Sequence, residues 1–243
     1  MIRYVIAGVL LFIGFAAAFA PAGLLDRVLQ QNTAADLTDT RGTLWAGQGS
    51  LLVNAMPLGR LDWDFAPSSL LRLTPRYDWY LNANDKQLQG NIAVRFGSAD
   101  LSAQGTLQAA AVNPSLRLYD IFVGGQFEVW PTQLSLKLES GTITALDGQI
   151  DWSGGLVRYT LSGLLRETTL PPLRALLSMS EAGTPRAEVY AQGEQTPLML
   201  LSLNDNGFAK VSITKLFTKL VDNPWPGSDP DHAVVIEVEE QIF

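Results

Sequence analysis

The clearest indication of the fold is the segment Gly59-Arg60-Leu61-Asp62-Trp63-Asp64-Phe65. Its apolar residues Leu61, Trp63 and Phe65 occupy every second position, and charged residues stand between them. Successive side chains of a β-strand point to opposite faces of the sheet, so this alternation is typical of a half-buried strand. We therefore expect Leu61, Trp63 and Phe65 to face a core, and Asp62 and Asp64 to face solvent.

The same alternation recurs along the rest of the chain, in residues 91–96, 134–139, 157–161 and 236–239. Residues that accept a positive φ lie between these runs, in the segments 82–86, 124–125, 154–155 and 204–207. Many short strands joined by tight turns predict an all-β fold, an antiparallel layered sheet or a β-sandwich-like roll. One or two short helices are expected to interrupt it, at residues 171–177 and 213–221.

The N-terminus carries a long uncharged stretch, residues 4–25, which ends at Asp26 and Arg27. Its apolar character comes mainly from Val5, Ile6, Leu10, Leu11, Phe12 and Phe15. A helix of about 20 such residues matches a hydrocarbon layer of roughly 30 Å. The stretch predicts a transmembrane helix that would anchor the chain in an inner membrane. With Arg3 on the short side, the positive-inside tendency leaves residues 1–3 cytoplasmic and the bulk of the chain periplasmic.

A cleaved signal peptide is the alternative interpretation of the N-terminus, because Ala18-Phe19-Ala20 imitates a processing site. Pro21 directly after that site argues against cleavage, and the apolar run exceeds a usual signal core of about 7 to 15 residues. After the helix we expect a linker at residues 26–39 and a β-rich domain at residues 40–243. Gly59 to Trp63 and Gly148 to Trp152 share the pattern Gly-x-aliphatic-Asp-Trp, which suggests two similar halves, about 40–130 and 131–243.

Composition excludes several classes of partner. The formal net charge is −7, so the chain has no basic surface for a nucleic acid backbone, and we expect no nucleic acid partner. The chain has no cysteine, which rules out disulfides and thiolate metal sites.

Catalytic groups are scarce. The single histidine is His232, and the chain has no Gly-x-Ser-x-Gly motif and no phosphate-binding glycine loop. Asp62 and Asp64 could in principle share a proton or bind a cation, but residues two apart on a strand are separated by about 6.8 Å. We therefore predict no enzyme activity, no cofactor and no metal site. For the tryptophans, packing in a core is the simpler explanation than stacking on a ligand.

Several short elements stand out along the chain. The first is Gly42-Thr43-Leu44-Trp45-Ala46-Gly47, a Gly-Thr-Leu-Trp-x-Gly element. It is followed by the strand with Trp63, which leads into Pro67 and Leu70-Leu71. Further along come Gly148 to Trp152, residues 170–173, residues 206–209, Asn223-Pro224-Trp225-Pro226 and the terminus at 239–243. These elements, and their order along nearly the whole chain, resemble secretion protein N of the type II secretion machinery (the GspN family).

The resemblance implies a single-pass inner-membrane accessory of the type II secretion apparatus, which exports folded proteins across the outer membrane. It implies other secretion components as partners and no catalytic residues. The residues we expect to serve as a structural motif are Gly42, Thr43, Leu44, Trp45, Gly47, Trp63, Pro67, Trp152 and Trp225. An assembly module that acts by protein contacts is the leading hypothesis, and its candidate edge strand is Ala233 to Val238. The rival hypothesis is a periplasmic β-groove that binds or transfers lipid.

Overall fold

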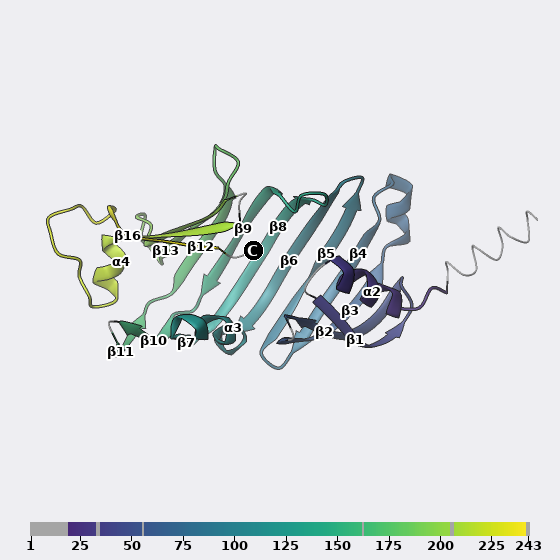
Figure 1. Ribbon diagram of the computed structural model, residues 1–243, viewed down its shortest axis with the longest axis horizontal. Helices are drawn as coiled ribbons and strands as arrows, with labels where there is room; N and C mark the ends of the chain where they lie inside the picture. The colour runs from purple at the N-terminus through teal and green to yellow at the C-terminus, as the bar shows by residue number, and fades with distance from the viewer. Residues whose placement is uncertain (1–18, 33–34, 55, 162, 205–206, 242–243) are drawn as a thin grey trace, which may run out of the picture. The chain divides into compact units, whose positions relative to one another are not determined.

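The computed structural model describes residues 19–32, 35–54, 56–161, 163–204 and 207–241 (Figure 1). The chain divides into two compact units. Unit 1 comprises residues up to 84 together with 89–93, and unit 2 comprises residues 85–88 and the chain from 94 onward. Strand β5 (Lys86–Arg95) contributes residues to both units.

Unit 1 is an antiparallel sheet with one α-helix. Its elements are α2 (Gly23–Asn32), β1 (Ala35–Gly42), β2 (Ala46–Val53), β3 (Met56–Phe65), the 3₁₀ helix η1 (Pro67–Arg72) and β4 (Arg76–Ala83), with the strands in the order β1-β2-β3-β4. Ala22, Leu37 and Trp63 form the buried cluster of this unit. Asp26 of α2 accepts a hydrogen bond of 3.0 Å from the amide of Leu37, which fixes the helix to the first strand.

Unit 2 contains a long antiparallel sheet and a small one. The long sheet runs in the order β6 (Ser98–Gln108), β8 (Gln126–Lys137), β9 (Ile143–Trp152), β12 (Leu173–Met179), β13 (Pro185–Ala191), β14 (Met199–Leu203), β15 (Phe208–Thr214) and β16 (Val234–Gln241). The small sheet has the order β11 (Leu164–Leu170), β10 (Gly155–Leu161) and β7 (Ile121–Val123). Three helices complete the unit: α3 (Ala109–Leu116), the 3₁₀ helix η2 (Arg117–Tyr119) and α4 (Lys215–Leu220).

The prediction of a mostly β, antiparallel fold with few short helices is confirmed. Within unit 2 the small sheet packs on the long one through a buried cluster of Trp152, Val157 and Leu170. The predicted helix at 213–221 is α4, and the predicted strand at Ala233 to Val238 is β16.

The predicted helix at residues 171–177 is wrong, because these residues lead into strand β12. Pro171-Pro172 lies just before the strand, where the missing amide of proline costs no sheet hydrogen bond. Arg174 and Leu176 are exposed while Leu173, Ala175 and Leu177 are half-buried, which is the period of a strand. The sequence contains both signals, and the strand period outweighs the suitability of the two prolines for a first helical turn.

Residues 4–18 of the predicted transmembrane helix lie outside the described residues. In the described part of the chain, no helix is long and apolar enough to cross a membrane. Residues 19–22 do not continue a helix as predicted: Pro21 forms a β-bridge with Thr43, and the amide of Leu44 donates to the carbonyl of Ala20 at 2.7 Å. The stretch 26–39, expected as a linker, holds most of α2 and the first part of β1.

Alternation does not always mark a buried face. Ile92, Val94 and Phe96 were expected to face a core, but all three are exposed, and Phe96 lies in a turn after β5. Leu138 and Leu161 are likewise exposed. A sheet can carry alternating apolar residues on a face that nothing in the described chain covers, and the sequence alone does not reveal that difference.

Candidate functional site

The Gly-Thr-Leu-Trp element of unit 1 forms the tight turn between β1 and β2. The amide of Thr43 donates to the carbonyl of Ala46 at 2.9 Å, and the hydroxyl of Thr43 accepts from the amide of Ala46 at 3.1 Å. Gly42 has a φ of +95°, and a Cβ there would lie 2.5 Å from the carbonyl oxygen of Ala46. Only glycine fits this position without strain. The turn therefore depends on the residue types that the motif specifies.

Trp63 locks this turn to strand β3. Its indole Nε1 donates to the carbonyl of Thr43 at 3.2 Å, and its side chain is buried. A Cβ at Gly47 would lie 2.7 Å from the Trp63 ring, so a glycine is needed for the ring to approach the backbone. Trp45 packs on Phe65 with ring centroids 5.0 Å apart. The structure thus brings together Gly42, Thr43, Trp45, Gly47 and Trp63.

Trp152 makes an equivalent contact in unit 2. It ends β9 as Trp63 lies near the end of β3, and its Nε1 donates to the carbonyl of Gly124 at 2.8 Å. Its ring stacks on Phe127 at a centroid distance of 6.2 Å. The Gly-x-aliphatic-Asp-Trp pattern therefore has the same local structure in each unit. Its tryptophan lies on a strand and donates a hydrogen bond to the carbonyl of a nearby turn.

Three motif residues remain. Leu44 lies in the turn between β1 and β2, and its amide donates to the carbonyl of Ala20 at 2.7 Å. Pro67 starts η1, where its ring suits the first helical turn. Trp225 lies in the proline-rich segment before β16 and is exposed.

The long sheet of unit 2 presents two chemically different faces at β8, β9 and β12. Glu128, Asp151 and Arg174 are direct neighbours across these strands, and they point to one face. The flanking positions point to the other face and are apolar: Phe127, Trp152 and Leu173 form one row, and Val129, Ile150 and Ala175 form the next.

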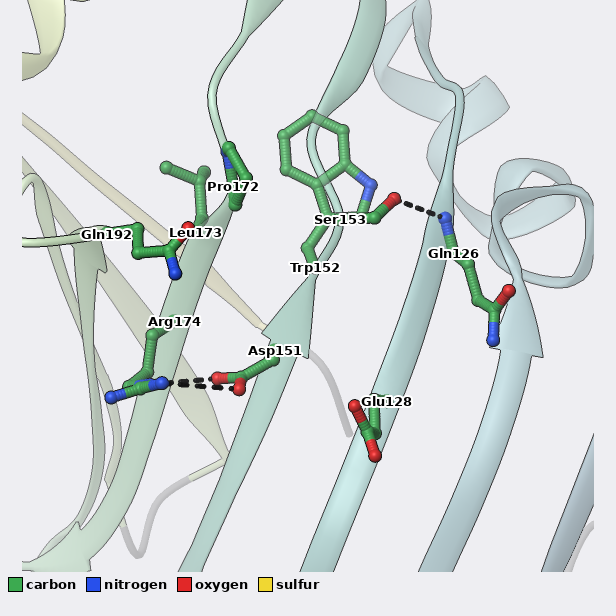
Figure 2. Close-up of a pocket in the computed structure, with 9 residues that line it drawn as sticks. All are labelled: Gln126, Glu128, Asp151, Trp152, Ser153, Pro172, Leu173, Arg174 and Gln192. Carbon is green, nitrogen blue, oxygen red and sulfur yellow. Dashed lines mark hydrogen bonds and ion pairs between the residues drawn. The ribbon is translucent and has the colours of Figure 1, made fainter.

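A polar pocket of about 280 Å³ lies on the first face, and Figure 2 shows its lining. Arg174 contacts the carboxylate of Asp151 through Nε at 3.0 Å and Nη2 at 3.4 Å. Trp130 and Gln149 also donate to Asp151, at 3.1 Å and 3.0 Å. Asp151 is therefore the centre of a hydrogen-bonded group on an otherwise open sheet face.

Burial raises the pKa of Asp151, but the hydrogen bonds from Arg174 and Gln149 and the charge of Arg174 outweigh burial and leave the pKa below its ordinary value. The group is an ion-paired carboxylate, and an acid kept ionised in this way is a poor proton donor. Ser153 lies in the same pocket, but its hydroxyl accepts from the amide of Gln126 at 3.0 Å and donates to the carbonyl of Gly154 at 3.1 Å. No base activates it among the residues that line the pocket.

A larger, apolar cavity of about 490 Å³ lies on the second face and is partly open to solvent. Its floor is the long sheet, and its other walls come from the small sheet, the α3 region and α4. The described lining comes from the long sheet (Phe127, Ile150, Trp152, Leu173, Ala175, Val189 and Met199), from the small sheet (Ile121, Val123, Val157, Tyr159, Thr160 and Leu170), and from Leu116, Tyr119, Phe217 and Val221.

Specific hydrogen bonds hold the walls of this cavity. The Asn113 amide group of α3 donates to the carbonyl of Val123 at 3.0 Å and accepts from its amide at 2.9 Å, which replaces a missing strand partner for β7. The hydroxyl of Tyr159 donates to the carbonyl of Val221 at 3.2 Å and ties β10 to the end of α4. The cavity is thus a built feature of unit 2.

Comparison with known proteins supplies the family. The sequence model described as type II secretion system, protein N, matches residues 33–223. The chain belongs to this family. No curated protein and no solved structure matches it. Membership in the protein N family links the chain to the type II secretion machinery of the cell envelope.

The candidate catalytic groups that the sequence offers belong to different units, Asp62 and Asp64 to unit 1 and His232 to unit 2. His232 is exposed in the acidic segment before β16. Asp64 is exposed, and Asp62 is half-buried and pairs with Arg60 at 3.2 Å. Within the described residues, no group of three or more His, Asp or Glu side chains could hold a metal ion.

An apolar β-groove is the rival hypothesis from the sequence, but the position and the lining residues of this cavity could not be predicted from it. Its lining comes from segments far apart in the sequence, and each contributes apolar residues that an ordinary core would also contain. One signal was available: Gly124-Gly125 and Gly154-Gly155 flank the short strands of the small sheet, and such paired glycines allow backbones to approach closely.

Proposed function

We propose that the protein is an inner-membrane-anchored assembly component of the type II secretion machinery that acts by protein contacts. The proposal leaves residues 1–3 in the cytoplasm, places the membrane anchor in the apolar stretch that begins at residue 4, and places the chain from residue 19 onward in the periplasm, as the apolar N-terminal stretch and family membership suggest. The motif residues Gly42, Thr43, Leu44, Trp45 and Gly47 then act in folding, since they build a turn and its packing.

The single observation that carries this proposal is the position of β16. It is the last strand in the order of the long sheet, and within the described chain it pairs with β15 alone. A strand with one partner has backbone groups that can bind a strand from another protein. Val234 and Val238 of β16 are exposed, at 42% and 51%, and would add apolar contacts to such a pairing.

Enzyme activity is not part of the proposal. The pockets of unit 2 combine an ion-paired carboxylate with an apolar cavity, and neither provides a nucleophile beside a base. The rival hypothesis of lipid binding requires an open apolar groove. Unit 2 contains an apolar cavity, and binding of a ligand there is compatible with the assembly role.

Crosslinking of the full chain in native membranes tests the assembly role. We expect Val238→Lys to remove crosslinks to other secretion components, because a lysine on an edge strand opposes strand addition. The matched control is Val94→Lys, which places the same charge at another exposed valine. If Val238→Lys and deletion of residues 233–243 both leave every crosslink unchanged, the edge assignment is wrong.

A further inference from the structure

We propose that the apolar cavity of unit 2 binds an acyl chain of a membrane lipid. This inference is independent of the assembly role, because it concerns the cavity and not the β16 edge. Three features carry it: the chemistry of the lining, the size of the cavity, and the exposed leucines beside its mouth.

The lining is almost wholly apolar, and its hydroxyl groups are those of Thr160 at the mouth and of two tyrosines. None of the described residues that line the cavity carries a charge. The two tyrosine hydroxyls are engaged elsewhere, Tyr159 with the carbonyl of Val221 at 3.2 Å and Tyr119 with the carboxylate of Glu240 at 2.7 Å. Binding a charged or sugar ligand here would leave its polar groups without partners, which is unfavourable. The lining therefore selects a hydrocarbon.

The size of the cavity argues against an ordinary packing defect. Protein interiors contain few voids larger than a water molecule. A void of ~150 Å³ already accommodates benzene, and this cavity measures about 490 Å³. That volume lies within the usual range of ligand pockets, roughly 300 to 1,000 Å³. A flexible chain of methylene groups can fill such a space without a fixed shape.

The mouth of the cavity adjoins an apolar surface. Tyr119 and Thr160 are the exposed members of the described lining, so they mark the opening. Thr160 pairs directly with Leu165 of the β10–β11 hairpin. At the end of this hairpin Leu164 and Leu165 are 59% and 68% exposed.

Exposed apolar residues of this kind mark a site of contact with a membrane or a protein. The hairpin thus provides a hydrophobic contact with lipid next to an opening that leads into a hydrocarbon-lined space. That combination favours a lipid tail over a soluble apolar ligand or a protein segment.

Tryptophan fluorescence can locate the acyl chain. We would reconstitute the full chain into phosphatidylcholine vesicles whose acyl chains carry bromine, which quenches tryptophan on contact. The first tryptophan of the chain is Trp45, so residues 4–25 contribute no signal of their own. We expect quenching relative to unbrominated vesicles, most of it lost in Trp152→Phe, whose indole lines the cavity, and retained in Trp225→Phe.

A filled cavity provides the decisive control. Ala175 points into the cavity and Leu176, the next residue, points to the opposite face. Ala175→Phe should abolish the Trp152 signal, and Leu176→Phe should leave it intact, with circular dichroism to establish folding. If the phenyl ring of Ala175→Phe prevents folding, Ala175→Leu is used in its place. The proposal is overturned if the intact chain shows no quenching, or if folded cavity-filling variants quench as strongly as the intact chain.

The hairpin has its own test. In this test, brominated vesicles are added to protein that is already in unbrominated vesicles. The double variant Leu164→Ser and Leu165→Ser should slow the onset of quenching. Leu138→Ser, at an exposed leucine of another hairpin, should not. Unchanged kinetics in the hairpin variant would contradict entry at this mouth. Native mass spectrometry of the chain extracted without detergent should also show a bound phospholipid. A partner protein that crosslinks to residues inside the cavity, with no lipid bound, would overturn the assignment of the cavity to an acyl chain.

Discussion

The indole of Trp152 donates a hydrogen bond of 2.8 Å to the carbonyl oxygen of Gly124. Trp63 makes the same type of bond to Thr43 at 3.2 Å in the other unit. In both cases a buried ring at or near the end of a strand satisfies a turn carbonyl, so one side chain supplies both packing and a polar contact.

Replacement of Trp152 by Phe separates these two contributions. We expect Trp152→Phe to lower the free energy of unfolding by about 1 to 2 kcal/mol, because it removes the bond to Gly124 and part of the ring volume. Chemical denaturation of the full chain measures the effect. Trp225→Phe is the control, since that ring is exposed and should contribute little. An equal loss in both variants would mean that burial does not govern the contribution of Trp152.

The two faces of β3 predict unequal effects of neighbouring substitutions. Trp63 is 6% exposed, and Trp63→Ala should lower the free energy of unfolding by about 3 to 5 kcal/mol. Asp64 is exposed and lies opposite Asp78 of β4, so Asp64→Ala should change it by less than about 0.5 kcal/mol. Denaturant melts of the two variants test the difference. Comparable losses would show that Asp64 has a role beyond a solvated strand face.

Two glycines with positive φ distinguish backbone strain from steric overlap. An added Cβ at Gly42 would collide with Ala46 and Gly47, whereas Gly97, with a φ of +78°, has nothing within 4 Å. Gly97→Ala should cost only the strain of that conformation, about 1 to 2 kcal/mol. Gly42→Ala should cost clearly more in the same unfolding measurement. If the two variants lose equal stability, the turn relaxes around the methyl group and the close approach is unimportant.

How much of this could be predicted from the sequence depends on the range of the interactions. Alternation and turn residues predicted the antiparallel β fold, because strand periodicity is local. The Gly-x-aliphatic-Asp-Trp repeat pointed to two similar strands, and β3 and β9 place their tryptophans alike. At residues 171–177 two local signals conflicted, and the strand period of β12 outweighed the prolines.

The candidate site was beyond local analysis. Ala175 and Ile150 are neighbours across two strands, but the sequence gives no pairing between them. An apolar residue in a strand predicts burial of one face, and whether a protein core or a ligand covers that face depends on the packing of distant segments. The hydrogen bond between Tyr159 and Val221 joins residues in separate elements and has no local signature.

The ion pair of Asp151 predicts a pH effect. The pKa of Asp151 is lowered from its ordinary value of 3.8 in the folded protein, so the pair stabilises the fold above that pH. The stabilisation is lost as the pH falls through the lower folded pKa, where the carboxylate takes up a proton. Arg174→Gln should therefore reduce the loss of unfolding free energy between pH 5 and pH 3. Arg166→Gln serves as the control at an exposed arginine of β11, and the same acid sensitivity in both variants would contradict this origin.

Lys215 is a buried lysine that joins α4 to the acidic segment before β16. It is 6% exposed at the start of α4, and its ammonium donates to the carbonyls of Gly227 and Asp229 at 2.6 Å and 2.9 Å. These bonds hold the exposed acidic segment that precedes β16 against α4, the helix whose Phe217 lines the cavity.

Lys215→Met keeps the length and apolar stem of the side chain but removes all its donors. We expect it to lower the free energy of unfolding by about 1 to 2 kcal/mol and to speed proteolysis within residues 223–231, because the loop carbonyls lose a charged donor. Lys219→Met is the matched control: Lys219 lies on the same helix but is exposed and pairs only at the surface with Asp231. Surface pairs contribute little, so this variant should be cleaved at nearly the rate of the unaltered chain. Equal cleavage rates for Lys215→Met and the unaltered chain would mean that other contacts hold the segment. The next contact to test is then the Thr218 hydroxyl, which accepts a hydrogen bond from the amide of Trp225 at 3.0 Å.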